Sequence, residues 1–432
     1  MFSGSASEKT VKPLGAYCFR FKSTFLLRLN PRRPSLYFQP RIFFVVKPLK
    51  VLVVGHGARE HAIAKKLAQE DLELVAAMSR LNPGIAALSE RVEVFDIDDP
   101  AEYGRFKDVD LAFVGPEAPL ATGVSDRLWE LGMPVVGPRR ALAKLEWSKA
   151  HTREVMQRHG IPGNPEFMVC RAAEDVDAFM KDHREVAVKP DVLTGGKGVK
   201  VTGDHLKTVE EARGYALERL KMDGLVVLEE KLVGREFTLQ AFTDGRRVEV
   251  MPLVRDFKRA YDGDRGPNTG SMGSFSCPDH GMPDLSPAVV EKGVYLVEYN
   301  SRFGDPEAIN VLALLETPLT EVGFGVAEGS LPETRFAGEA TVCVYITPEG
   351  YPVNPLRDQP IEVGETGHSE LYYASVYDDH GVVKTTGSRS VALLGRGRTV
   401  QEARERVYMD VGSIKGRLHY RTDIAAPAYL SF

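Results

Sequence analysis

Residues 50–62 read KVLVVGHGAREHA, an apolar run that ends in a turn with two glycines and continues as an amphipathic stretch. This order predicts a strand, a tight turn and a helix, the first part of a βαβ unit. Further short apolar runs follow at 74–78, 92–95, 111–114 and 134–136. Strands that alternate with helices form parallel sheets, so we expect a parallel α/β domain here.

Beyond residue 139 the pattern mixes helical stretches with strands and hairpins. A single helical stretch is predicted over 140–158, and Asp244-Gly245 marks the turn of a hairpin. The other predicted strands are 185–189, 224–231, 236–242, 247–254, 339–346 and 391–394, and the other predicted helices are 208–222 and 400–415. We therefore divide the chain into a basic extension (1–49), an α/β domain (50–150), a mixed domain (151–330) and a compact C-terminal domain (331–432).

The composition is that of an ordinary folded protein. Of 432 residues, 43% are hydrophobic and 27% are charged, which excludes a disordered, collagen-like or coiled-coil chain. No apolar run approaches the roughly 18 to 20 residues of a membrane-spanning helix, so no membrane partner is predicted. The four cysteines have no CxxC spacing, which argues against a zinc cluster or a disulfide framework and favours a reducing compartment.

Charge is distributed unevenly along the chain. Residues 1–49 hold nine Lys or Arg and one acid, a balance of +8, and since the whole chain carries −5 the remainder carries −13. An acidic body argues against nucleic-acid binding. The basic, serine-containing start resembles an organelle transit peptide. The alternatives are a translation start placed too far upstream and a genuine basic arm. The predicted location is the cytoplasm, and an organelle is the alternative if the segment is a transit peptide.

The glycine turn at Gly55 and Gly57 lies where backbone N–H groups can approach an anion. A dinucleotide is disfavoured because Glu60 replaces the third glycine and no acid follows the second strand at Ser79-Arg80. A phosphate-bearing small molecule suits the turn better, and a turn without a ligand is the alternative. Glu117 follows the apolar run 111–114, at the edge of the sheet where α/β proteins bind ligands.

A second glycine loop follows the strand that ends at Lys189. It differs from a Walker A sequence because a glycine stands where Ser or Thr would bind magnesium, yet it suits a flap over triphosphate oxygens. The residues of this flap are Gly195, Gly196, Lys197 and Gly198. Lys189 itself ends an apolar strand, so its charge needs either a phosphate or an internal salt bridge.

The stretch 256–273 combines paired charges with many glycines, which indicates a backbone shaped around anionic substrates, with a long flexible loop as the alternative. Further on, Glu298 and Asn300 lie two apart on a predicted strand and therefore on one face. Two hard oxygen donors make a magnesium site when phosphates complete the shell. Arg302 is placed to bind phosphate, and Asp305 is predicted as the N-cap of the helix that begins at Pro306.

Together these motifs resemble those of the phosphoribosylamine–glycine ligase family, ATP-grasp enzymes of purine biosynthesis. The resemblance runs from about residue 50 to the C-terminus. The motifs are GHGAREHA (55–62), VGPEAPL (114–120), WSKAHTR (147–153), VKPDVLTGGKGV (188–199), LEEKLVGRE (228–236), RDFKRAYDGDRGPNTGSMG (255–273) and EYNSRFGDPEA (298–308). The segments GPNTGSMG and RFGDPE are the most specific in combination.

The resemblance implies a pre-ATP-grasp parallel α/β N-terminal domain, an ATP-grasp fold and a small β-rich C-terminal domain. It also implies a reaction in which ATP phosphorylates glycine to glycyl phosphate and the amine of 5-phosphoribosylamine attacks it. The products are glycinamide ribonucleotide, ADP and phosphate. The implied partners are ATP, glycine and 5-phosphoribosylamine, with Mg²⁺ or Mn²⁺ as cofactor, no nucleic acid, and a monomer or homodimer as the assembly.

Site roles also follow from the resemblance. The residues implied to hold the ATP phosphates are Lys149, Lys189 and the flap residues Gly195, Gly196, Lys197 and Gly198, and those for the adenosine end are Glu229 and Glu236. Glu298 and Asn300 are implied as metal ligands. The residues implied to orient the acyl phosphate are Asp256, Lys258, Asn268, Thr269 and Arg302. Those implied to face phosphoribosylamine are Gly55, Gly57, Glu117, Gly304 and Asp305.

The chain departs from the family pattern at three places. Phe257 replaces a histidine, Ser271 replaces a glycine, and only 23 residues lie between Gly273 and Val297. The family places a long helix, a loop and a strand in that interval, which needs more residues. We therefore expect an internal deletion near 292/293.

Three alternatives to the active ligase follow. The first is a non-catalytic or impaired ATP-binding remnant of this ligase. The second is a related ATP-grasp carboxylate–amine ligase of purine synthesis with another acyl substrate, disfavoured by GPNTGSMG and RFGDPEA. An NAD-dependent enzyme is the least favoured, because of the residues around Gly55.

Overall fold

The computed structural model describes residues 21–23, 42–44, 47–192, 198–277 and 293–430. The chain divides into two compact units, Met1–Pro48 and Leu49–Phe432. In the first unit, β1 (Phe21–Ser23) and β2 (Ile42–Phe44) form an antiparallel pair. Most of the predicted basic extension lies outside the described residues.

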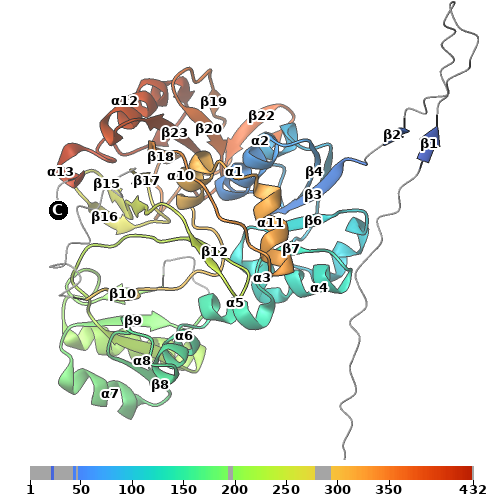
Figure 1. Ribbon diagram of the computed structural model, residues 1–432. Coiled ribbons are helices and arrows are strands. Elements are labelled where there is room, and N and C mark those ends of the chain that lie inside the picture. Colours follow the sequence, from blue (N-terminus) through green and yellow to red (C-terminus); the bar gives the residue numbers. More distant parts are fainter. Residues whose placement is uncertain (1–20, 24–41, 45–46, 193–197, 278–292, 431–432) are drawn as a thin grey trace, which may run out of the picture. The chain divides into compact units, whose positions relative to one another are not determined.

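The second unit begins with a five-stranded parallel sheet in the order β5-β4-β3-β6-β7, which confirms the predicted parallel α/β domain. The strands are β3 (Leu49–Val54), β4 (Leu72–Met78), β5 (Arg91–Val94), β6 (Leu111–Val114) and β7 (Val135–Val136). The helical elements between them are α1 (Ala58–Leu67), α2 (Pro83–Ala87), the 3-10 helix η1 (Pro100–Phe106), α3 (Glu117–Thr122) and α4 (Val124–Glu130). Because the strands are parallel, their carboxyl ends and the turns that follow lie at one edge of the sheet (Figure 1).

The run 50–54 is apolar at successive positions because β3 is buried on both faces. Val51 and Val53 pack in the same core cluster as Ile63 and Leu67 of α1. Leu52 and Val54 belong to a second cluster on the opposite face, with residues of η1 and α4. Burial of each such side chain contributes about 1.5 to 3 kcal/mol, so β3 is the anchor of this domain.

The prediction of one helix over 140–158 is wrong. Two helices, α5 (Arg140–Trp147) and α6 (Lys149–Arg158), meet at Ser148, whose backbone is extended at φ −119° and ψ 104°. The Ser148 hydroxyl accepts the His151 N–H at 3.2 Å and donates to Asp191 at 3.0 Å. Ser148 therefore caps α6 and breaks the helix, which periodicity alone does not reveal.

A four-stranded antiparallel sheet in the order β10-β9-β11-β8 follows. Its strands are β8 (Phe167–Cys170), β9 (Val186–Pro190), β10 (Lys200–Val201) and β11 (Val226–Glu230). Helices α7 (Ala173–Asp182) and α8 (Val209–Asp223) pack side by side against it, and Figure 1 shows them at the lower left. The predicted strands at 185–189 and 224–231 and the helix at 208–222 are thus confirmed within one or two residues.

The predicted hairpin around Asp244-Gly245 is present but short, with β12 (Ala241–Thr243) paired to β13 (Val248–Val250). A six-stranded sheet then runs in the order β14-β17-β18-β23-β20, with β25 also on β18, and α12 covers it. The elements of this β-rich part are β14 (Arg255–Asp256), β17 (Gly273–Ser276), β18 (Ala340–Pro348), β20 (Glu370–Tyr373), β23 (Val391–Gly397), β25 (Leu418–His419) and α12 (Val400–Asp410).

Small hairpins and helices complete the unit. The paired short strands are β15 (Arg259–Tyr261) with β16 (Arg265–Asn268), β19 (Glu362–Val363) with β24 (Ile414–Lys415), and β21 (Val376–Asp379) with β22 (Val382–Thr385). The remaining helical elements are α10 (Glu307–Leu314), α11 (Leu319–Glu328), the 3-10 helix η2 (Val411–Ser413) and α13 (Pro427–Leu430). No helix in the described ranges is both long and apolar enough to cross a membrane.

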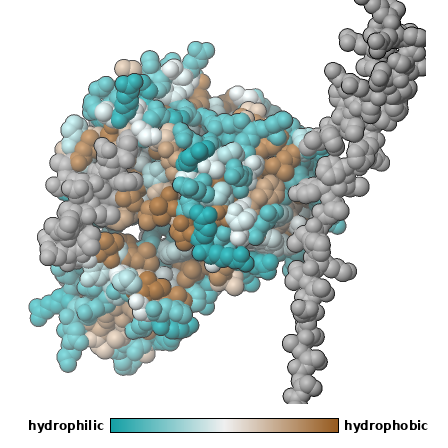
Figure 2. All heavy atoms as spheres, viewed as in Figure 1, coloured by the Kyte–Doolittle hydropathy of each residue, from teal (hydrophilic) through white to brown (hydrophobic). Residues whose placement is uncertain are grey.

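The prediction that Glu298 and Asn300 lie on a strand is wrong. Residues 293–300 form no strand, and the backbone is held instead by the Leu296 N–H, which donates to Gly163 O at 2.8 Å. In the hairpin of β12 and β13, Val248 and Val250 are 63% and 59% exposed. Figure 2 shows apolar residues over the middle of the molecule, where Figure 1 places β12. A strand needs a neighbouring strand to accept and donate its backbone hydrogen bonds. The alternating side chains around Glu298 are therefore not enough to make residues 293–300 a strand.

The capping prediction for Asp305 is also wrong. Helix α10 begins at Glu307 with Pro306 as its N-cap residue, and no side chain caps it. The Asp305 carboxylate instead pairs with Arg389 at 3.1 Å and accepts a short hydrogen bond from the Tyr345 hydroxyl. An ion pair with a distant residue has therefore replaced the local cap.

Arg421 provides a test of the C-terminal part of the fold. Its side chain is fully buried and bonds Asp264 and Asp423, both at 2.7 Å. Replacing Arg421 by Met removes the ion-pair partner of both carboxylates, so we expect a loss in the free energy of unfolding that approaches the roughly 3 to 5 kcal/mol of a broken buried pair. Urea unfolding measures it. The control is Arg417→Met, because Arg417 forms an exposed pair with Glu349 and should cost at most about 1 kcal/mol. Equal losses in the two variants would contradict the role of burial.

His61 provides a pH test. It is buried in α1 and its Nδ1 accepts the Tyr373 N–H at 2.8 Å. Burial, with the nearby charge of Lys65, lowers the pKa of His61 to about 3 from 6.5. Below pH 6.5 the unfolded chain therefore binds a proton that the folded chain excludes, so stability falls as the pH is lowered, by about 1.4 kcal/mol per pH unit.

His61→Asn keeps an acceptor for the Tyr373 N–H but does not titrate, so we expect a flatter dependence of the unfolding free energy between pH 6.5 and 4. The control is His380→Asn, whose histidine is fully exposed. It should leave the slope unchanged. An unaltered slope in the His61 variant would show that other groups cause the dependence.

Candidate active site

The glycine turn between β3 and α1 encloses a buried carboxylate. Gly55 has φ 122°, and a Cβ there would lie 2.5 Å from Glu60 Cγ. A Cβ on Gly115, in the turn after β6, would lie 2.1 Å from Glu60 Oε1. The Gly57 N–H donates to Glu60 Oε2 at 2.7 Å. Glu60 therefore explains why both turns need glycine, and it occupies an N–H group that the sequence analysis offered to a ligand anion.

An arginine–carboxylate cluster lies beside this turn. Arg59 Nε is 2.5 Å from Glu60 Oε1, and Arg59 Nη1 is 3.9 Å from Glu117 Oε2. Arg302 approaches the same Glu117 oxygen at 3.5 Å and binds Glu146 at 2.8 Å. Burial opposes ionisation of Glu117, but Arg302 and Arg59 outweigh it and lower its pKa. The structure thus brings the predicted residues Glu117 and Arg302 together, although 185 positions separate them in the sequence.

A second cluster surrounds Lys258. Its ammonium forms a short ion pair with Glu236. Burial acts to lower the pKa of Lys258, but the carboxylates of Asp256, Glu236 and Glu298 outweigh it and raise the pKa. Burial raises the pKa of Asp256 to about 7, which Lys258 only partly opposes. Four residues predicted for the site, from three stretches of sequence, therefore share one charge network.

Glu298 and Asn300 remain in contact even though they are not on a strand. Burial opposes ionisation of Glu298, but Lys258, Lys189 and a hydrogen bond from Asn300 lower its pKa. A carboxylate and an amide are residue types that supply oxygen ligands to a divalent cation. Among the described residues, no three His, Cys, Asp or Glu side chains gather as a complete metal centre. A cation here needs further ligands from a bound substrate.

Glu229 holds the backbone just before Glu298. Arg153 binds its two oxygens at 2.7 and 2.9 Å, and Lys189 binds Oε2 at 2.7 Å. Arg153 and Lys189 also donate to Val297 O, at 2.9 and 2.8 Å. The internal salt bridge considered for Lys189 is therefore confirmed. Glu229 is 2% exposed with both oxygens occupied, whereas Glu236 is exposed and pairs with Lys258. The role of both residues at the adenosine end stays a prediction.

Lys149 lies at the start of α6, where burial lowers its pKa against the opposing charges of Asp191 and Glu298. Within the described ranges its Nζ donates to one acceptor, Val192 O, at 3.3 Å. The flap residues Gly195, Gly196 and Lys197 lie outside the described residues. Gly198 is described, and its carbonyl accepts the Tyr215 hydroxyl at 2.7 Å.

The loop that carries Asn268 and Thr269 is held by internal bonds. The Thr269 hydroxyl donates to Lys258 O at 2.8 Å and accepts the Ser271 N–H at 3.0 Å. Asn268 Nδ2 faces His205 Nε2 at 3.3 Å instead of Lys258. Ser271 has φ 85°, a conformation that favours glycine, and its hydroxyl donates to Gly273 O at 2.8 Å. The serine that replaces a family glycine is thus accommodated by its side-chain hydrogen bonds.

Gly304 and Asp305 lie next to this loop. A Cβ on Gly304 would lie 2.4 Å from Glu307 Oε2, so a larger residue there would displace the Glu307 side chain. Arg389 connects Asp305 to the loop, because its Nη1 donates to the carbonyls of Ser271 and Asp305, both at 3.1 Å. Gly304 and Asp305 therefore belong to the wall of the site, next to the loop with Thr269.

The sequence analysis missed several residues of the site. They are Arg59, Glu60, Glu146, Arg153 and Arg389. Arg59, Glu60 and Arg153 lie inside the motifs quoted above, so their place in these motifs could have indicated them as site residues. Nothing in the sequence near Glu146 or Arg389 indicated their partners.

Comparison with known proteins places the whole second unit in one family. Models of phosphoribosylglycinamide synthetase match in order: the N domain over residues 49–146, the ATP-grasp (A) domain over 147–292 and the C domain over 341–427. Phosphoribosylamine–glycine ligase from Methanosarcina acetivorans is 42% identical over 422 residues, covering 88% of this chain and 96% of that protein. The Thermococcus gammatolerans ligase is also 42% identical, over 416 residues, covering 87% and 94%.

The same alignments bear on the short interval before Val297. An alignment of 422 positions that covers 88% of 432 residues, about 380, includes about 40 positions at which the Methanosarcina protein has residues and this chain has none. The match to the ATP-grasp domain model ends at residue 292.

Solved structures agree with the fold. The phosphoribosylamine–glycine ligase of Thermotoga maritima superposes with a TM-score of 0.73 at 26% identity, covering 87% of this chain and all of that one. A biotin carboxylase domain from Hydrogenobacter thermophilus shares the fold alone, with a TM-score of 0.64 at 15% identity over 87% of this chain and 92% of that one. The predicted ATP-grasp architecture is confirmed, and the chain belongs to the phosphoribosylamine–glycine ligase family.

Proposed function

We propose that this chain ligates glycine to 5-phosphoribosylamine with hydrolysis of ATP, giving glycinamide ribonucleotide, ADP and phosphate. One observation carries the proposal: the charge network of Asp256, Lys258, Glu236 and Glu298 adjoins a separate cluster in which Glu117 lies between Arg59 and Arg302. In the first cluster, the Lys258 ammonium can offset the negative charge of a transferred phosphoryl group. In the second, the Glu117 carboxylate can accept a hydrogen bond from an amine. The Methanosarcina, Thermococcus and Thermotoga proteins described above carry the ligase name, and none of them favours a non-catalytic remnant.

In the first step, a glycine carboxylate oxygen bonds the γ-phosphorus of ATP while the bond to the β-phosphate oxygen breaks and ADP leaves. Lys258 and Arg302 offset the negative charge on the transferred group. Lys149 is the better-placed lysine for ATP phosphates, since its Nζ makes one long bond to a carbonyl. Lys189 reaches them only by sharing its bonds with Glu229.

In the second step, the amine of phosphoribosylamine attacks the carbonyl carbon of glycyl phosphate, the bond from that carbon to the phosphate oxygen breaks, and the departing phosphate takes the proton that the amine loses. Glu117 accepts a hydrogen bond from the amine, because its pKa is lowered and it stays ionised. Catalysis is then positioning and charge neutralisation, without a covalent intermediate on the protein.

A divalent cation fits the proposal. Glu298 and Asn300 would hold it together with ATP oxygens, and its chemistry is to neutralise charge on the phosphates. The biotin carboxylase domain that shares the fold was solved with magnesium ADP. We take Mg²⁺ as the cation, with Mn²⁺ as a substitute. A monomer or homodimer, and the cytoplasm or an organelle, remain predictions.

The short interval 274–296 is part of the proposal. A deletion near 292/293 accounts for the roughly 40 positions missing relative to the Methanosarcina protein and for a metal segment without a neighbouring strand. Sequencing the transcript across Lys292–Gly293 tests it, because an intact reading frame with additional codons would explain the shortness as an error in the sequence. Confirmation of the present junction would establish that the protein lacks this segment.

The activity test uses the full chain with ATP, glycine and phosphoribosylamine, and measures glycinamide ribonucleotide and ADP. We expect equal amounts of both products. Lys258→Met should lower kcat/KM by about 10² to 10³, the usual cost of losing one charge-stabilising group. Lys415→Met is the control, because Lys415 is exposed and pairs only with Glu362. ATP binding without product in the unmodified chain would favour the impaired remnant instead.

The cation test uses Glu298→Gln. The substitution removes the one carboxylate of the proposed site, so the Mg²⁺ concentration for half-maximal activity should rise by more than the roughly tenfold that loss of an outer-shell partner costs. Paramagnetic resonance of bound Mn²⁺ in the presence of ATP gives an independent measurement. Glu362→Gln, an exposed residue, serves as the control. Unchanged Mn²⁺ binding would remove Glu298 from the site.

A further inference from the structure

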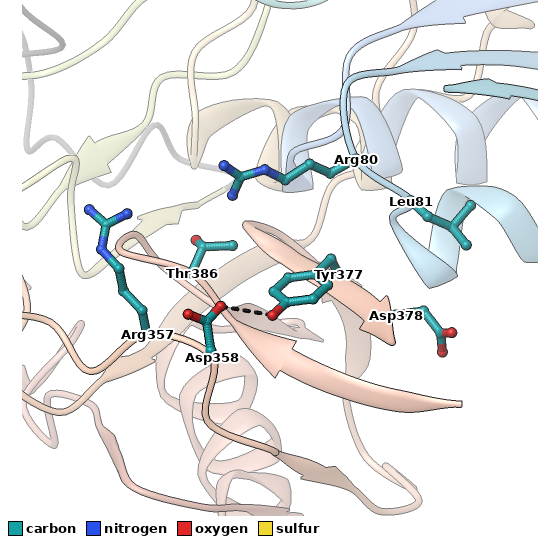
Figure 3. Close-up of a pocket in the computed structure, with 7 residues that line it drawn as sticks. All are labelled: Arg80, Leu81, Arg357, Asp358, Tyr377, Asp378 and Thr386. Carbon is teal, nitrogen blue, oxygen red and sulfur yellow. Dashed lines mark hydrogen bonds between the residues drawn. The ribbon is translucent and has the colours of Figure 1, made fainter. Parts of the chain in front are cut away.

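A separate cavity lies between the end of β4 and the C-terminal domain. Its volume is about 480 Å³, within the range of sites for small molecules. Arg80 and Leu81 line it from the first sheet, and Arg357, Asp358, Tyr377 and Thr386 line it from the C-terminal domain (Figure 3). None of these residues was assigned a role by the sequence analysis.

The cavity presents two free positive charges. Neither Arg80 nor Arg357 has a carboxylate within ion-pair distance among the residues that the structure describes. Figure 3 shows both guanidinium groups directed into one space beside Thr386. Asp358 accepts the Tyr377 hydroxyl at 2.7 Å, and Asp378 points away and accepts the Gly381 N–H at 3.0 Å. The two guanidinium groups therefore face one space, and the Asp358 carboxylate, bound to Tyr377, lies at its edge.

The local backbone supports this arrangement. A Cβ on Gly387 would lie 2.6 Å from Arg357 Nη2, so glycine lets the guanidinium lie close to the loop. Thr386 is buried and its hydroxyl donates to Ser375 O at 2.8 Å, so it forms a satisfied wall. Planar guanidinium groups bind phosphate oxygens in pairs, and two of them suit a phosphate monoester with its double charge.

The cavity adjoins the glycine turn. Asn82 Nδ2 donates to His56 O in that turn at 2.9 Å and to Tyr373 O of the C-terminal domain at 3.0 Å. Arg80 is close enough to His56 to act on its charge. Because Glu60 already accepts the Gly57 N–H, that group of the turn is not available to a phosphate, whereas the two arginines beside it are.

The spacing matches a sugar phosphate. Arg80 follows β4 and Glu117 follows β6, and one strand, β3, lies between them. Two strand spacings amount to roughly 10 Å. A phosphoribosyl group carries its phosphate and its amine at opposite ends of the ring, so it can reach both positions.

We propose that Arg80 and Arg357 bind the phosphate monoester of the sugar-phosphate substrate, with the Asp358–Tyr377 pair next to its hydroxyl groups. This site rests on the proposed function for the identity of the sugar phosphate. It assigns the phosphate to the arginine cavity and leaves the amine end to Glu117.

The test is calorimetric titration of the full chain with ribose 5-phosphate, without ATP. We expect Arg80→Ala and Arg357→Ala each to weaken binding at least tenfold, and ribose without phosphate not to bind. Arg398→Ala is the matched control, because Arg398 is exposed in the same domain and lies outside the cavity. Inorganic phosphate is the second probe, and it should bind more weakly than ribose 5-phosphate. Equal affinity for both would overturn the assignment to a sugar phosphate.

Kinetics separate this site from the function itself. In a chain that makes glycinamide ribonucleotide, Arg80→Ala should raise the KM for phosphoribosylamine at least tenfold and leave the KM for ATP and glycine unchanged. The double variant carries both Arg80→Ala and Arg357→Ala. If its KM for phosphoribosylamine, its affinity for ribose 5-phosphate and its urea unfolding are all unchanged, the site is overturned while the function stands. Arginine-dependent ribose 5-phosphate binding in a chain without ligase activity would support the site and refute the function.

Discussion

The buried carboxylate of Glu229 is the contact on which the geometry of the site depends. Two cations, Arg153 and Lys189, converge on it from α6 and β9, and both also hold the Val297 carbonyl. Removing one partner from such a pair leaves an uncompensated buried charge, which is far costlier than losing a surface pair. Glu229 therefore fixes the position of Glu298, one residue after Val297, without the help of a strand.

Glu60 has the same function in the first domain. Its carboxylate joins the turns after β3 and β6 and neutralises Arg59, which in turn faces Glu117 and the Phe303 carbonyl. Both buried carboxylates hold a cation at the candidate site without leaving that cation free. The site is thus organised by internal ion pairs, and substrate phosphates meet a surface whose charges are already positioned.

The elements that could be predicted from the sequence are those set by local periodicity. The parallel sheet followed from the apolar run at 50–54 and its repeats, and the glycine turns followed from their place after strands. The failures have a common physical cause, which is a partner far away in the chain. Ser148 breaks a helix because Asp191 accepts its hydroxyl, and Asp305 leaves its helix uncapped because Arg389 and Tyr345 bind it. Such contacts leave no periodic trace in the sequence.

The error at Glu298 and Asn300 is of a different kind, because their motif was recognised and their spacing was correct. Alternation on a strand places two side chains on one face only where a neighbouring strand enforces the pleat. The interval of 23 residues before Val297 is too short for the family's helix and strand, and residues 293–300 accordingly form no ladder. The positions of Glu298 and Asn300, the proposed metal ligands, then depend on Arg153, Lys189 and the contact between Glu298 and Asn300. A segment held at one carbonyl has more freedom than a strand in a sheet. The missing interval therefore reduces the positional precision of the proposed cation site more than it reduces the stability of the fold.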